Sequence, residues 1–373
     1  MCGNHRSRTY SLDLFSIALS INLAIGLTVK ALFRRADSAG RALSSIVCKM
    51  IKAGGFTYNI YTKLVLACVT SIAEYGSEVI GYCDYESPNK LYLRAARAFL
   101  GIPKNGPIPG IIAEISWLLP HYSRRLKMIR FYDRMLNLED DRLTKVVYLW
   151  DKHLNTSHIV NTWHYEIYSI FNQCNLPGLY EMISKQPLEL IINNLKINML
   201  RQQQEEISLK CQEKPKLRTY IKIANFKEIP AYLTTPIPYV LRRLICKARL
   251  GCLPLRLETA RYSRPVIPAE ERICNICDNV EGNIEDIFHL LFVCDVYTNE
   301  RNFWMQKLLL PDVFQLFVNE DKLITVLSGP YNVRSTARFI MKAMDKRSCV
   351  IREKTSNNIY HTDPPEECIA CNP

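Results

Sequence analysis

The sequence predicts a mainly α-helical protein. Apolar residues recur at intervals of three and four along most of the chain, as at Ile60, Leu64, Cys68 and Ile72, which is the period of an amphipathic helix. Breaks rich in proline and glycine, such as residues 102–110, separate these segments. Nowhere does the chain show a long apolar–polar alternation typical of strands or an internal repeat of fixed period.

Length and composition indicate an ordinary globular protein. The 373 residues suffice for two or three domains, and 48% are hydrophobic and 23% charged. The 14 cysteines show no regular framework, and most stand singly in apolar helical segments, where cysteine behaves as a small hydrophobic residue. We therefore expect a reducing compartment, nuclear or cytoplasmic.

Residues 1–30 contain an apolar segment but are not expected to cross a membrane. The apolar stretch covers residues 14–27 and includes Ser16, Ser20 and Asn22. It is shorter than the ~20 residues that span a bilayer. Basic residues follow it, without a clear cleavage site for a signal peptide. We predict a buried helix here and no membrane partner.

Helices are predicted through residues 31–138. Two of them flank a Gly-Gly break at residues 54–55. A third covers residues 88–100, with Ser87 as its N-cap and Gly101 as its C-terminal stop. A strongly basic helix begins at Ser123.

Residues 139–214 are predicted to be a connector of short helices. The glutamine run at residues 202–204 and the Lys214-Pro215-Lys216 break indicate a linker near residues 202–218. A basic amphipathic helix over residues 236–250 follows two prolines.

The positive charge of the chain is concentrated in the segment that contains this basic helix. The net charge is +12, and residues 201–264 hold 14 Lys/Arg against 5 Asp/Glu, whereas residues 265–373 hold 11 against 16. A charge run alone is most often a solvated face. When such a run lies next to a metal-binding segment, as described below, it is also the electrostatic pattern of a phosphate-binding surface. The side chains expected to contact phosphates are Arg242, Arg243, Lys247, Arg249, Arg261 and Arg264.

A metal site is predicted just after this segment. Cys274 and Cys277 form a Cys-x-x-Cys knuckle, and His289 and Cys294 return from an apolar segment of helical period. Four nitrogen and sulfur ligands are the number that a closed, structural Zn²⁺ site requires, with no open position for catalysis. The alternative is four unrelated buried residues.

The helix that carries His289 is expected to begin near Asn283. Asn283 is a suitable N-cap, and Glu285 and Asp286 favour the first turn through the helix dipole. Because Glu285 precedes His289 by one helical turn, we expect its carboxylate to orient the imidazole.

The C-terminal region is predicted to be helical over residues 311–354 and disordered over residues 355–373. A second thiol pair, Cys368 and Cys371, lacks a complete ligand set and is interpreted as incidental. Asp312, Glu320 and Lys322 imitate a nuclease pattern, but that pattern requires strands where a helix is expected.

Several blocks of the sequence resemble LINE-type (non-LTR) retrotransposon reverse transcriptases. The segment from Tyr75 to Gly81 resembles the family's "YGSEVWG" signature, with Ile80 in place of its tryptophan. The resemblance covers roughly residues 31–304 and is most specific in the order and spacing of the blocks. Further blocks lie at residues 94–102, 114–117, 124–134, 216–220, 257–262, 271–277, 287–291 and 294–301.

The resemblance implies an architecture. Residues 31–138 would form a thumb-like helical bundle, residues 139–214 a helical connector, and residues 215–310 the basic helix with a small CCHC zinc-knuckle module. The thumb-like part would add a second nucleic-acid-binding surface, formed by Arg94, Arg97, Arg124, Arg125 and Arg130.

The family's polymerase chemistry is not expected in this chain. It requires carboxylates on a Tyr-x-Asp-Asp hairpin upstream of Tyr75, and residues 1–74 contain no such motif. The one Asp-Asp pair, Asp140 and Asp141, stands in a predicted loop on the wrong side of the thumb. No catalytic residue is therefore assigned, and the chain is not expected to be an enzyme.

Three functions stay open at this point. The first is a nucleic-acid-binding remnant or fragment of a reverse transcriptase that binds RNA or DNA backbones, with a full-length retroelement polymerase as a further partner in trans. The second is a helical structural or protein-interaction fragment whose zinc only stabilises the fold. The third is part of an active RNA-directed DNA polymerase whose palm lies outside this sequence.

Overall fold

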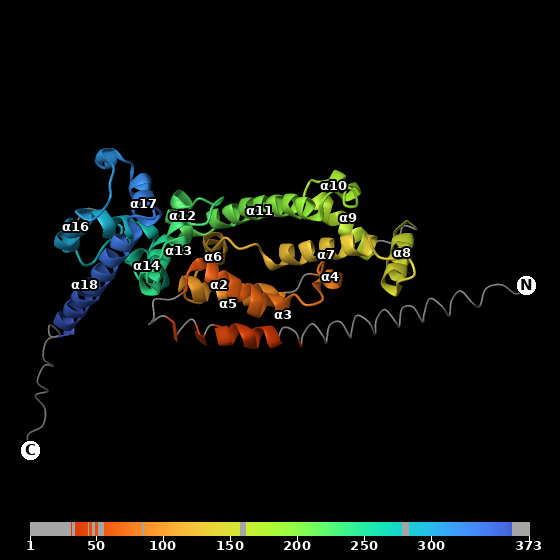
Figure 1. Ribbon diagram of the computed structural model, residues 1–373. Helices are drawn as coiled ribbons and strands as arrows, with labels where there is room; N and C mark the ends of the chain where they lie inside the picture. Colours follow the sequence, from red (N-terminus) through yellow and green to blue (C-terminus); the bar gives the residue numbers. More distant parts are fainter. Residues whose placement is uncertain are drawn as a thin grey trace, which may run out of the picture. The chain divides into compact units, whose positions relative to one another are not determined.

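The predicted mainly α class is confirmed. The computed structural model describes residues 31, 34–43, 45–46, 49–50, 56–83, 86–156, 162–277 and 283–359, and helices dominate them (Figure 1). In this part of the chain, the one isolated β-bridge joins Ile273 to Ile284. The chain divides into two compact units: unit 1 is Met1–Leu100, Ile108–Glu213 and Phe226–Ile229, and unit 2 is Gly101–Pro107, Lys214–Asn225 and Pro230–Pro373.

Unit 1 is a bundle in which the long helix α11 lies along α7 (Figure 1). Its core includes Ile129, Ile167, Phe171, Ile191 and Leu195, all of them essentially inaccessible to solvent. Its elements are α2 (Tyr58–Val65), the π-helix η2 (Leu66–Thr70), α3 (Ser71–Ala73), α4 (Ser77–Ile80), α5 (Glu86–Leu100), α6 (Ile108–Ile115), α7 (Pro120–Leu136), α8 (Leu143–Thr156), α9 (Trp163–Gln173), α10 (Pro177–Glu181) and α11 (Leu188–Gln212).

The helix boundaries in this unit follow simple backbone chemistry. Helix α5 ends before Gly101, whose φ of 66° is a left-handed conformation that favours glycine, as predicted. The predicted basic helix begins three residues before Ser123, because Pro120 occupies its first turn, where a missing N–H costs nothing.

The predicted linker near residues 202–218 is wrong for its first half. Residues 202–204 lie inside α11, which continues to Gln212. Gln203 is buried; its Oε1 accepts the N–H of Leu119 at 2.9 Å and its Nε2 donates to the carbonyl of Trp117 at 2.9 Å. Gln203 therefore holds the segment that precedes α7, and the helix ends at Gln212, just before the Lys214-Pro215 break.

Unit 2 is built around helices α14 and α18, which lie side by side (Figure 1). Trp304 of α16 stacks on Phe339 of α18, with ring centroids 4.6 Å apart. The elements of unit 2 are η3 (Pro215–Leu217), α12 (Arg218–Ile223), α13 (Ala231–Thr234), α14 (Tyr239–Arg249), α15 (Arg256–Thr259), η4 (Ala260–Tyr262), η5 (Ala269–Glu271), the π-helix η6 (His289–Val293), η7 (Asp295–Tyr297), α16 (Thr298–Met305), η8 (Asp312–Leu316), α17 (Asn319–Leu327) and α18 (Val333–Ile359).

Two predictions for the chain ends can be compared only in part. Helix α18 continues through Ile359, so the predicted disordered tail of residues 355–373 is wrong for residues 355–359. The remaining tail, with Cys368 and Cys371, lies outside the described residues, as do residues 1–30 and the Gly-Gly break.

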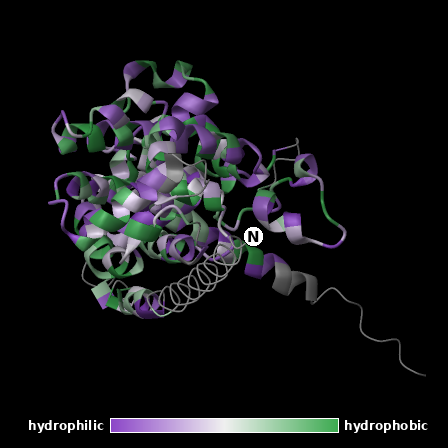
Figure 2. Cartoon of the chain, turned by 90° about the vertical axis from the view of Figure 1, so that its right-hand side faces the viewer, coloured by the Kyte–Doolittle hydropathy of each residue, from purple (hydrophilic) through white to green (hydrophobic). Residues whose placement is uncertain are grey.

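Hydrophilic and hydrophobic residues are mixed along the helices (Figure 2). Among the described residues, no helix combines the length and the apolar content needed to cross a lipid bilayer.

Candidate metal centre and cationic strip

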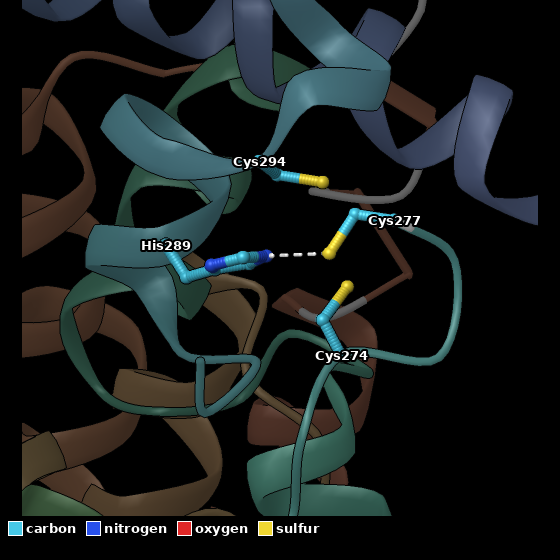
Figure 3. A group of neighbouring side chains, drawn as sticks. All are labelled: Cys274, Cys277, His289 and Cys294. Atoms are coloured by element: carbon cyan, nitrogen blue, oxygen red, sulfur yellow. Dashed lines mark hydrogen bonds between the residues drawn. The ribbon is translucent and has the colours of Figure 1, made fainter. Parts of the chain in front are cut away.

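The four predicted metal ligands lie together in unit 2. Cys274 and Cys277 come from one loop, His289 is the first residue of η6, and Cys294 directly follows the last (Figure 3). All four are buried, and one ligand atom from each lies within 4.8 Å of the others. The imidazole Nε2 of His289 is 3.6 Å from the sulfur of Cys277. This buried Cys₃His group could hold a metal ion.

The donor set and its spacing fit a tetrahedral ion. With metal–sulfur bonds of about 2.3 Å, neighbouring ligand atoms of a tetrahedral Zn²⁺ site lie about 3.8 Å apart. The separations here, 3.6 Å between the Cys277 sulfur and the His289 Nε2 and no more than 4.8 Å within the group, are close to that value. A closed Cys₃His set supplies a structural cross-link and leaves no position for a substrate.

A π-turn explains how His289 and Cys294, five residues apart, can both face one metal ion. In a regular α-helix, residues five apart are rotated by about 140° around the axis, so the two side chains would diverge. Here the N–H of Cys294 donates to the carbonyl of His289 at 2.8 Å, five residues back. The wider turn returns Cys294 to the side of the helix where His289 lies, and single π-turns of this kind are frequent at functional sites.

The helix that carries His289 begins later than predicted. The carboxylate of Asp286 accepts the backbone N–H of His289 at 2.8 Å, which makes Asp286 the N-cap. Asn283, the predicted N-cap, lies instead in an extended pairing, where its carbonyl accepts the N–H of Cys274 at 2.9 Å. Burial raises the pKa of Asp286, and its hydrogen bond from the His289 N–H partly offsets that rise.

The predicted role of Glu285 is wrong. Its carboxylate does not orient His289; it accepts two hydrogen bonds from the guanidinium of Arg347, at 2.6 and 2.8 Å. It also accepts the backbone N–H of Arg256 at 2.7 Å. Glu285 and Arg347 are both buried, so this bidentate pair ties the metal module to α18 in a water-poor environment.

Other cations fix the loops around the ligands. Lys354 donates to the carbonyl of Asn275 at 3.1 Å, between the two knuckle cysteines. Arg301 donates to the carbonyl of Leu291 at 2.9 Å and also to that of Cys294. Sequence reasoning missed these contacts because no spacing rule links the cations to carbonyls far along the chain.

The ligand sulfurs influence one another's protonation. A hydrogen bond from Cys294 holds the pKa of Cys274 below its usual range, and that shared proton together with burial raises the pKa of Cys294. One sulfur of the group is therefore readily available as a thiolate, the form that binds metals.

Two of the six cations predicted to contact phosphates in unit 2 are buried. Arg242 lies 5.3 Å from the ring of Tyr239, and Arg249 lies between Tyr220 and Tyr232. A buried guanidinium cannot reach a phosphate at the surface, so the predictions for Arg242 and Arg249 are wrong. Both side chains share the inward face of α14.

The other face of α14 carries Arg243, which is exposed, and Lys247, which is half-buried, and further cations lie near them. Lys247 lies close enough to Arg243 for that cation, after burial, to lower its pKa. Lys247 and Lys216 both act electrostatically on the thiol of Cys252. We call the set Arg243, Lys247, Lys216, Arg218 and Arg261 the cationic strip.

One carboxylate joins the far end of this strip. Glu258 lies 3.1 Å from Arg218 and 3.2 Å from Arg261, and only 12% of its side chain is exposed. Among the described residues, Arg243, Lys247 and Lys216 form no ion pair, and Arg243 is exposed. Arg264, three residues beyond Arg261, is also exposed.

The cations predicted to contact nucleic acid in unit 1 are less accessible to a phosphate than those of the cationic strip. Arg124 is buried and donates to the carbonyl of Cys83 at 3.1 Å, so its prediction is wrong. Arg94 pairs with Asp37, and Arg130 lies 3.7 Å from Glu189. Arg97 and Arg125 are half-buried.

The Asp-Asp pair and the nuclease-like pattern of the sequence lie in turns and helices. Asp140 and Asp141 stand in the turn between α7 and α8. Asp312 belongs to η8 and Glu320 to α17, where it pairs with Lys222 at 2.6 Å. A strand-borne nuclease site is therefore not formed by these residues.

Comparisons of the chain with protein-family models, with curated proteins and with solved structures found no match.

Proposed function

We propose that this chain is a nucleic-acid-binding fragment related to LINE-type reverse transcriptases, in which Zn²⁺ at Cys274, Cys277, His289 and Cys294 forms a CCHC knuckle. The zinc cross-links the knuckle loop to η6, and the neighbouring cations contact the phosphate backbone of RNA or DNA. The chain supplies binding and no polymerase step of its own.

The single observation that carries this proposal is the cationic strip beside the metal group. Among the described residues, Arg243, Lys247 and Lys216 form no ion pair, whereas Arg218 and Arg261 pair with Glu258. Cations without internal partners remain available to release the counterions of a nucleic acid. The ordered sequence blocks that resemble the reverse transcriptases support the same class of partner.

Neutralising the outward face of α14 tests this function. In a binding titration of the full chain over a salt series, the double variant R243Q/K247Q should weaken binding to both RNA and DNA. Each lost phosphate contact lowers the salt slope by ~0.7 on a single strand and ~0.9 on duplex DNA. The double variant should therefore lose about 1.4 units of slope on single strands and about 1.8 on duplex DNA.

The matched control is R334Q/R338Q. These two arginines have the same spacing and are exposed on α18, so the control removes the same charge from another part of unit 2. It should change the slope by much less. Wild-type protein that binds no nucleic acid at low salt, or equal slopes for both double variants, would contradict the proposal.

A second candidate function is protein interaction through unit 1. Helix α8 exposes a stripe of apolar side chains at the spacing of one helix face: Leu143, Val146, Val147 and Trp150, with exposed fractions of 78%, 48%, 53% and 56%. This candidate predicts a folded, zinc-containing chain that gives no signal in the same nucleic-acid titration.

A further inference from the structure

An exposed aromatic ring stands at the end of the cationic strip. Tyr262 directly follows Arg261, and 68% of Tyr262 is exposed to solvent. Arg264 is exposed two residues later, and Val266 is 68% exposed. We call residues 262–267 the platform loop. Core packing explains none of these three exposed side chains.

The platform loop is nevertheless held firmly. The buried guanidinium of Arg272 donates Nε and Nη2 to the carbonyl of Ile267, at 3.0 and 2.8 Å, and Nη1 to the carbonyl of Leu257 at 2.9 Å. The hydroxyl of Ser263 lies 2.7 Å from the carbonyl oxygen of Ala260 and 3.0 Å from that of Pro265. Hydrogen bonds thus hold the loop at Ser263, next to Tyr262, and at Ile267.

The anchor also links the platform loop to the metal module. Arg272 lies two residues before Cys274, and its own carbonyl accepts the N–H of Glu285 at 3.0 Å. The loop is therefore supported by the pairing that shapes the zinc knuckle. A ring presented on such a support loses little conformational freedom when a ligand stacks on it.

We propose that the platform loop binds single-stranded nucleic acid, with one base stacked on the ring of Tyr262 and the adjoining phosphates on Arg261 and Arg264. This inference rests on the proposed function, because the cationic strip would deliver the strand to the loop. An isolated exposed ring favours a single strand, whose bases have free faces, over a duplex, whose bases are already stacked.

The test compares three tyrosine variants of the full chain. Binding of a fluorescent single-stranded 12-mer and of the matching duplex is measured for wild type, Y262A, Y262F and Y331A. Tyr331, which is 78% exposed elsewhere in unit 2, is the matched control. Y262A should weaken single-strand binding by about 5- to 100-fold, whereas Y262F and Y331A should stay within about twofold of wild type.

A strand that lacks bases separates stacking from charge. An abasic 12-mer keeps every phosphate, so wild type and Y262A should bind it equally weakly. The salt slope of Y262A should match that of wild type, because no phosphate contact is lost. Thermal melting and zinc content check that the variants fold.

The possible failures are distinguishable. If wild type binds and Y262A binds the single strand as tightly, or if the substitution weakens the duplex equally, the platform is wrong while the proposed function stands. If wild type binds neither nucleic acid, both the platform and the proposed function are wrong.

Discussion

At the scale of single residues, the cations of α14 fall into two groups, one buried in unit 2 and one on the other face of the helix. Arg242 and Arg249 lie seven positions apart, on the face that also carries buried Ile245 and Cys246. Arg243 and Lys247 lie four apart on the other face. The helical period separates the two groups, but it does not say which group is buried, because the apolar residues Val240 and Leu244 lie beside Lys247.

Glu285 illustrates the residue-scale information that a sequence lacks. Its distance from His289 in the chain suggested a direct contact, but the helix starts too late for the two to share a turn. Its true partner, Arg347, lies 62 positions away. Such a pair depends on the packing of α18, which no local pattern encodes.

The buried pair leads to a stability prediction. The substitution E285Q leaves the guanidinium of Arg347 buried without a countercharge, which should lower the free energy of unfolding of unit 2 by about 3–5 kcal/mol. The measurement is urea denaturation of the full chain.

The neighbouring cation provides the control. Lys346 pairs with Glu300 at 3.0 Å, with side chains that are 37% and 26% exposed. Because water screens this pair, K346A should cost no more than about 1 kcal/mol. If E285Q and K346A lowered the free energy of unfolding equally, burial would not strengthen the contribution of the Glu285–Arg347 pair.

At the scale of elements, helix existence was predicted better than helix extent. Helix α5 ends before Gly101 and α14 begins directly after Pro238, as predicted, since glycine and proline act through the local backbone. The predicted N-cap Ser87 is wrong, because α5 already begins at Glu86. The sequence predicts a linker inside α11, because three consecutive glutamines look like a solvated connector. Gln203 contradicts that interpretation only through contacts with Trp117 and Leu119, 84 or more positions away.

Gln203 should therefore matter more than its neighbours. Q203A leaves the N–H of Leu119 and the carbonyl of Trp117 without their partners, which should lower the free energy of unfolding of unit 1 by about 1–3 kcal/mol. The measurement is again urea denaturation.

Gln204 is the matched control, because its amide makes only a long, exposed hydrogen bond of 3.5 Å to Lys227. Q204A should stay within about 0.5 kcal/mol of wild type. The interpretation of α11 as a continuous, anchored helix would be contradicted if Q203A were equally mild.

At the scale of the whole molecule, the metal group belongs to unit 2 alone. A metal that binds only the folded unit stabilises it by mass action, by about 4 kcal/mol at a free metal concentration 1,000 times the dissociation constant. Removing it should lower the melting temperature of unit 2 by roughly 10 °C and leave that of unit 1 unchanged.

Calorimetry with and without a chelator checks this prediction. Two transitions should appear, and only one should move when metal is removed. C277S should mimic the chelator, whereas C349S, at an exposed thiol outside the cluster, should not. Movement of both transitions together, or of neither, would contradict a metal confined to the stability of unit 2.

The ligand set was predictable from sequence because Cys-x-x-Cys with a returning histidine and cysteine is a local pattern. The cationic strip was predictable only in part. The sequence predicts Arg243, Lys247 and Arg261, but Lys216 and Arg218 join them through the close approach of Gly251 to the backbone of Lys216 and through Glu258. That convergence is a tertiary property.

The π-turn between His289 and Cys294 also has a consequence for the spacing of the ligands. A helix that gains one residue normally rotates everything beyond it, and a metal site would be lost. At η6 the extra residue is absorbed within a single widened turn. The knuckle can thus tolerate a change in ligand spacing by exchanging one turn type for another.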